Sequence, residues 1–101
     1  MKVTVMPNKD MVYFSARLAL RGQGVTHLAE EKLSAEEIIF RKIEENKVGR
    51  SIAYPLIYNK KVKRQHGLLK NKRLCQFMET VNESNKWIAQ DSGDKIILIP
   101  Q

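Results

Sequence analysis

The chain has 101 residues, of which 43% are hydrophobic, and its formal net charge is +7. This length is enough for one domain with one hydrophobic core, and it excludes an enzyme with separate cofactor and substrate domains. A single cysteine and two histidines exclude an intramolecular disulfide and a zinc site made from Cys and His alone. We therefore expect a single domain over residues 1–101 that holds no metal and no other cofactor.

The distribution of apolar residues bears on location. No stretch approaches the run of about 18 apolar residues that reads as a membrane span. The first ten residues, "MKVTVMPNKD", lack the apolar core of a signal peptide. We expect a cytoplasmic or otherwise intracellular protein.

Residues 1–33 are expected to form an N-terminal extension that contains β-structure. "KVTVM" at residues 2–6 alternates and is rich in β-branched residues, and "PNKD" after it is typical of a turn, so the pattern predicts a strand. Residues 11–21 fit two structures. Alternating apolar residues favour a strand, whereas Asp10 as an N-cap and Gly22 as a stop favour a helix. Residues 25–28 fit a short strand.

"SAEEIIFRKIEENKVG" carries the clearest local signal. Ser34 followed three residues later by Glu37 matches a capping box, and Gly49 lies just beyond the apolar pattern. The segment therefore predicts a helix over about 35–47, with Ile39, Phe40 and Ile43 as its core-facing stripe.

The middle of the chain predicts a second helix. Pro55 in "RSIAYPLIYN" allows either an edge strand or an extended lead into a short helix that begins at this proline. Beyond it, apolar residues at i, i+3, i+4 and i+7 from Leu74 predict a helix over about 70–82. Cys75 lies on the apolar flank of that helix, so we expect a core thiol.

The C-terminal segment "KWIAQDSGDKIILIPQ" predicts a β-hairpin, because "DSGD" separates two β-rich runs. Trp87 in the first run is expected in the core, as is Tyr54. The predicted class is thus α+β: a small single domain with one or more N-terminal strands, two main helices at about 35–47 and 70–82, and a C-terminal hairpin.

The order of elements over residues 34–101 resembles that of a winged helix-turn-helix domain. The resemblance implies that the helix at 70–82 enters the major groove of DNA and that the hairpin forms the wing. Asp91 and Asp94 at the wing tip depart from the pattern, since phosphates repel them. A second resemblance, of residues 2–28 to the opening strand, helix and strand of Alba-type chromatin proteins, implies the same class of partner.

The positive charge is concentrated in the sequence. Residues 46–78 hold nine Lys and Arg and no acidic residue, whereas the rest of the chain holds nine bases and eleven acids. Such segregation is typical of surfaces that bind nucleic acid, because neutralised phosphates release counterions. We predict binding of nucleic acid, DNA rather than RNA, and of duplex DNA in a transcription-regulatory or architectural role. The candidate nucleic-acid-binding residues are Lys60, Lys61, Lys63, Arg64, Lys70, Lys72, Arg73 and Gln76.

Two other functions stay open. The basic face could serve a protein-interaction adaptor with an acidic partner. Asp10 with Glu30 and Lys32 forms a loose version of the Asp and Glu-x-Lys pattern of Mg²⁺-dependent nucleases. A charged run such as this is more often a solvated surface, so we do not expect an enzyme. His27 and His66 are expected to have structural or surface roles.

Overall fold

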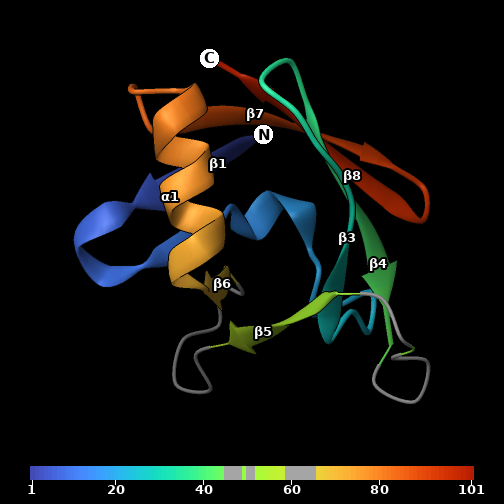
Figure 1. Cartoon of the computed structure of the whole chain (residues 1–101). Coiled ribbons are helices and arrows are strands. Elements are labelled where there is room, and N and C mark those ends of the chain that lie inside the picture. Colours follow the sequence, from blue (N-terminus) through green and yellow to red (C-terminus); the bar gives the residue numbers. More distant parts are fainter. Residues whose placement is uncertain (45–48, 50–51, 59–65) are drawn as a thin grey trace.

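The computed structural model describes residues 1–44, 49, 52–58 and 66–101. Within these residues, eight antiparallel strands close into a barrel with the order β1-β2-β6-β5-β3-β4-β8-β7 around the ring. Figure 1 shows the strands arranged around a central space, with helix α1 lying beside β1. The strands are β1 (Lys2–Met6), β2 (Met11–Phe14), β3 (His27–Leu33), β4 (Ile38–Ile43), β5 (Ala53–Tyr58), β6 (Gly67–Lys70), β7 (Lys86–Ser92) and β8 (Lys95–Pro100). Helix α1 spans Lys72–Val81, and two 3-10 turns, η1 and η2, span Pro7–Lys9 and Ala16–Leu18.

Alternation along each strand fills the barrel. Successive side chains of a strand point to opposite faces, so every second residue enters the interior. Phe14 of β2, Phe40 of β4 and Trp87 of β7 are fully buried there. Tyr54 is also buried, so the expected core positions of Trp87 and Tyr54 are confirmed.

Helix α1 adds its apolar side to the same core. Leu74, Cys75 and Met78 are buried, and they belong to one cluster with the strand residues. The helix begins after Asn71, whose Oδ1 accepts the Leu74 N–H at 2.8 Å. The predictions of a helix at 70–82 and of a core thiol at Cys75 are therefore confirmed.

The helix predicted for residues 35–47 is wrong, because Ile38–Ile43 form strand β4. Ser34 does make the hydrogen bond that the capping pattern predicts: its Oγ accepts the Glu37 N–H at 3.2 Å. The same Oγ donates to the Glu37 carbonyl at 2.8 Å, which closes a turn between β3 and β4. Ile38 and Phe40 then alternate into the core, whereas Ile39, which was expected to face the core, lies on the opposite face of the strand and is only partly buried. Pairing with β3 and β8 overrides the local helix signal.

The predicted α+β class and the resemblance to a winged helix-turn-helix domain are wrong as well. The described residues form one α-helix, and they otherwise form mainly strands. The C-terminal hairpin is present, with Gly93 at φ 66° in its turn, but it is not a free wing. Its strand β7 pairs with β1 and its strand β8 pairs with β4, so both sides of the hairpin are built into the barrel.

Of the two segments for which the sequence left two structures open, the second is a strand, and the first, residues 11–21, is a strand only over its first four residues and continues into the 3-10 turn η2. Met11–Phe14 form β2, which pairs antiparallel with β1, so the helix implied by the resemblance to Alba-type proteins is wrong. Ala53–Tyr58 form β5, which is an internal strand because it pairs with both β3 and β6. Pro55 lies where the pairing of β5 passes from β3 to β6, and this position tolerates a residue without an N–H.

No helix in the described part of the chain combines the length and the apolar character that a membrane crossing requires.

Candidate functional site

Two adjoining hollows lie on the outside of the barrel, where β2 passes into η2. The larger has a volume of about 490 Å³, and the smaller of about 370 Å³. Ser15 and Arg17 line both, so the hollows are two parts of one groove, which we call the β2–η2 groove. Its described lining residues are Met1, Lys2, Tyr13, Ser15, Ala16, Arg17 and His66.

The groove is assembled from three strands that meet at one end of the barrel. The Ser15 N–H donates to the Lys2 carbonyl at 3.2 Å, which places the end of β2 beside the start of β1. Phe14 pairs with Gly67, so His66 arrives beside the same end of β2 from the other side. Ser15 then begins η2, because its Oγ accepts the Arg17 N–H at 3.3 Å. The local turn thus fixes Arg17 between the two hollows.

An aromatic pair lines the larger hollow. The ring centroids of Tyr13 and His66 lie 5.0 Å apart, with an interplanar angle of 34°. Tyr13 alternates with the buried Val12 and Phe14 along β2, so its ring is on the outer face of the barrel, where it is partly exposed. The groove therefore offers a flat apolar surface next to hydrogen-bonding groups.

The charge of the groove is positive. Among its described lining residues are Lys2 and Arg17, and none of them is Asp or Glu. Within the described part of the chain, neither cation forms an ion pair. The two side chains are available to an anionic ligand without the loss of an internal partner.

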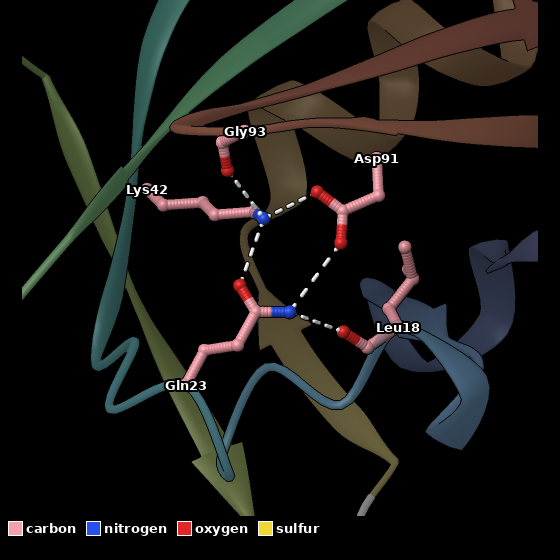
Figure 2. Close-up of polar contacts among 5 residues, drawn as sticks. All are labelled: Leu18, Gln23, Lys42, Asp91 and Gly93. Atoms are coloured by element: carbon pink, nitrogen blue, oxygen red, sulfur yellow. Dashed lines mark hydrogen bonds and ion pairs between the residues drawn. The ribbon is translucent and has the colours of Figure 1, made fainter.

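A second polar cluster closes the same end of the barrel from the inside. Lys42 follows the buried Ile38 and Phe40 in alternation, so its side chain points inward, and only 7% of it is exposed. Figure 2 shows its ammonium group between three acceptors. These are Asp91 Oδ1 at 2.5 Å, Gly93 O at 2.7 Å and Gln23 Oε1 at 2.8 Å. An ammonium group has three donors, so Lys42 is fully satisfied.

Lys42, Gln23, Asp91 and Gly93 form a group of contacts that we call the Lys42 cluster, and it anchors the segment that carries η2. Gln23 Nε2 donates to the Leu18 carbonyl at 2.8 Å and to Asp91 Oδ2 at 3.3 Å (Figure 2). The loop after η2 is thereby connected to β4 and to the β7–β8 hairpin. Since Arg17 lies in η2, the cluster also anchors the turn whose backbone carries one of the two groove cations. A further hollow of about 290 Å³ adjoins the cluster, lined in part by Gln23 and Lys42.

Half of the predicted nucleic-acid-binding residues lie in the described part of the chain. Lys70 ends β6, and Lys72, Arg73 and Gln76 lie on α1; all four are exposed. They do not line the β2–η2 groove. The predicted residues Lys60, Lys61, Lys63 and Arg64 lie outside the described residues.

The two acidic residues that departed from the winged-helix pattern have different surroundings. Asp91 forms the ion pair with Lys42, so its charge is compensated within the barrel end. Asp94 is exposed and lines the hollow beside the Lys42 cluster. Neither lines the β2–η2 groove.

The residues of the nuclease pattern have other contacts. Glu30 Oε2 accepts the Tyr54 hydroxyl at 2.7 Å, and Lys32 forms an ion pair with Glu37 at 2.7 Å. Pairing between β3 and β4 shifts register between Glu30 and Lys32. Within the described residues, no three or more His, Cys, Asp or Glu side chains are grouped so that they could hold a metal ion. The nuclease function stays an untested alternative.

Several buried groups have shifted pKa values that reflect the closed barrel. Burial raises the pKa of the Cys75 thiol to about 11, and the nearby Asp10 carboxylate adds to the increase. Burial likewise raises the pKa of Tyr58 to about 12, and its hydroxyl donates to the Val25 carbonyl at 2.6 Å. Burial and the hydrogen bond to Glu30 raise the pKa of Tyr54, while Arg73 opposes this increase. Cys75 is therefore a protonated core residue at neutral pH and not a nucleophile.

Sequence reasoning missed the residues that line the groove. Lys2, Ser15 and His66 are far apart in the chain, and only strand pairing brings them together. One signal was present: if residues 11–14 are read as a strand, Tyr13 faces outward between two core residues.

Comparison with protein-family models, with curated proteins and with solved structures gave no match. The function is therefore argued from the geometry and charge of the chain itself.

Proposed function

We propose that this protein binds nucleic acid through the β2–η2 groove. The observation that carries the proposal is the combination of Lys2 and Arg17 with the Tyr13–His66 pair in one groove whose described lining residues include no acid. Cations bind phosphates, aromatic rings stack on bases, and nucleic-acid sites combine the two.

The charge distribution along the chain supports the same partner. His66 directly follows the segment that contains Lys60, Lys61, Lys63 and Arg64 in the sequence. Residues 46–78 as a whole contain nine bases and no acid. A long-range positive potential of this kind raises the rate at which polyanions encounter the surface.

The ring pair separates nucleic acid from a simple anion. Phosphate alone would be bound by Lys2, Arg17 and the Ser15 hydroxyl, and it would gain nothing from Tyr13. Any of the bases gains stacking energy from an exposed aromatic ring, so this contact does not depend on the nucleotide sequence. The groove therefore suits a ligand that presents a phosphate and a base together.

Salt-titrated binding tests the proposal. Fluorescence anisotropy with labelled oligonucleotides should give an affinity that falls with salt, and each phosphate contact should contribute about −0.7 to −0.9 to the slope of log K against log[salt]. A polyglutamate chain of equal charge serves as the control, because it supplies anions without bases. Equal affinity for polyglutamate would favour the adaptor function, and no binding to any nucleic acid would refute the proposal.

A further inference from the structure

We infer that the preferred ligand is a single-stranded segment, with one unpaired base stacked on Tyr13 in the larger hollow and a neighbouring phosphate bound by Arg17 and Ser15. This inference rests on the proposed function, because it specifies which form of nucleic acid the same groove takes. It assigns separate roles to the two hollows.

The larger hollow is shaped for a base. Its volume of about 490 Å³ is within the range of about 300–1,000 Å³ that is typical of small-ligand sites. Tyr13 and His66 supply its aromatic wall, and both side chains are partly exposed. We place the base against the solvent-exposed part of the Tyr13 ring, which is not covered by His66 in a parallel stack because the two rings are tilted by 34°.

The shared edge of the two hollows supplies the phosphate site. Ser15 and Arg17 line both hollows, and the Ser15 Oγ already accepts the Arg17 N–H, which leaves its hydroxyl proton free to donate to a phosphate oxygen. Lys2 lines the smaller hollow beyond this edge. A strand that lies along the groove thus meets an aromatic wall, then Ser15 and Arg17, and then a second cation.

This arrangement discriminates against a duplex. In a double helix the bases are stacked on one another and only their edges reach the grooves, so the flat face of a base cannot contact Tyr13. A single strand can turn one base out of its stack at little cost. The groove therefore exploits a surface that only unpaired nucleic acid offers.

The test compares a ten-nucleotide oligothymidylate with three other ligands of the same length. These are its duplex with oligoadenylate, an abasic deoxyribose-phosphate strand and oligouridylate. The protein variants are Tyr13→Val, which removes the ring but keeps strand preference, and Tyr13→Phe, which keeps the ring. Tyr13→Val should weaken oligothymidylate binding by roughly 5- to 150-fold, the range for loss of one base stack, and Tyr13→Phe should retain it. Duplex and abasic strands should bind more weakly than oligothymidylate and should respond little to Tyr13→Val.

The possible outcomes separate the single-strand inference from the proposed function. Equal affinity for duplex and single strand, or unchanged oligothymidylate binding by a folded Tyr13→Val variant, overturns the single-strand inference and leaves the proposed function intact. If none of the oligonucleotides binds in a salt-dependent manner, both the single-strand inference and the proposed function are overturned. If Tyr13→Val does not fold, the unmodified protein decides: equal affinity for the abasic and thymidylate strands excludes base stacking. Oligouridylate, which carries a 2′-hydroxyl and lacks the C5-methyl group of thymine, should also bind more tightly than the abasic strand, because any base has a face that can stack. Binding of oligouridylate no tighter than that of the abasic strand would contradict stacking.

Discussion

Two cationic regions at one end of the barrel use their charge differently. Lys42 is inside the barrel mouth, where its ammonium group donates to Gln23, Asp91 and Gly93 and its side chain is almost fully buried. Arg17 in η2 and Lys2 in β1 line the groove on the outer face, and among the described residues they form no ion pair. The first region connects parts of the fold, whereas the second is the one that we propose meets a ligand.

The comparison shows that formal charge in the sequence does not identify a binding surface. Lys42 and Arg17 each add one positive charge, but only the position of each side chain relative to acidic residues decides its use. The two regions are also connected, since Gln23 binds both Lys42 and the carbonyl of Leu18 in η2. The buried cation thereby supports the exposed one.

The largest expected effect is the loss of stability on Lys42→Met. The substitution removes three hydrogen bonds and leaves the Asp91 carboxylate without its counter-ion. Removing one partner of a buried ion pair costs about 3–5 kcal/mol, and the partial exposure of Asp91 reduces this to roughly 2–3 kcal/mol. Urea denaturation measures the change. Lys32→Met is the matched control, because its ion pair with Glu37 is exposed and should contribute no more than about 1 kcal/mol. Equal losses in the two variants would contradict the distinction.

The next effect concerns binding and not stability. Arg17→Gln combined with Lys2→Gln should weaken binding to oligothymidylate about tenfold at low salt and make the salt slope shallower by about 1.4, because two phosphate contacts of about 0.7 each are lost. The free energy of unfolding should change by less than about 0.5 kcal/mol, since both side chains are on the surface. Anisotropy and thermal unfolding measure the two quantities. Lys32→Gln with Lys95→Gln removes the same net charge from exposed ion pairs, so equal weakening by this control would show that only net charge matters.

Alkaline pH should lower the stability of the fold through the buried Cys75 thiol. The pKa of Cys75 is raised from 9.0 to about 11 in the folded state, so above pH 9 the unfolded chain releases a proton that the folded chain retains. Stability is therefore complete below pH 9 and falls as pH rises toward 11. At pH 9.5 the loss from Cys75 should be about 1 kcal/mol or less. Urea denaturation of the unmodified protein and of Cys75→Ala measures it; an identical pH dependence in both would show that the thiol is not responsible.

The smallest effect is expected at α1, which carries residues that the sequence favoured for DNA contact. His66, which lines the groove, directly precedes β6, and Lys70 is the last residue of this strand. Four residues of a strand span about 13 Å, so α1 begins at the end of β6 that is remote from the groove. Lys72→Gln with Arg73→Gln should weaken oligothymidylate binding less than threefold, through long-range charge alone. Anisotropy at several salt concentrations checks this. A larger loss than that of the Arg17 and Lys2 double variant would place the interface on α1.

Local patterns predicted the parts of the fold that short-range contacts decide. The strand at residues 2–6, helix α1 and the β7–β8 hairpin follow from alternation, from apolar spacing and from turn residues. The Ser34–Glu37 pair was misinterpreted because a helix cap and a tight turn use the same hydrogen bond, from the Glu37 N–H to the Ser34 hydroxyl. Only pairing with β3 and β8, which the sequence does not display, distinguishes the two.

The candidate site was less predictable than the fold. Lys2, Ser15 and His66 are brought together by pairing across more than 60 positions of the chain, and no motif marks them. The charge segregation led to the prediction of a nucleic-acid partner, which stays a proposal, and it directed attention to α1, because its exposed bases follow one another in the sequence. Closure of a barrel is a long-range property, so residues on its outer face become neighbours only once the ring is complete.

Mapping the bound oligonucleotide by NMR tests the central claim most directly. Titration of the ¹⁵N-labelled protein with ten-nucleotide oligothymidylate should shift the backbone amide signals of Tyr13, Ser15 and Arg17, and that of His66, while those of Lys72 and Arg73 change little. This result would place the ligand in the β2–η2 groove. Shifts concentrated on α1, with unchanged signals at Ser15 and Arg17, would contradict the account.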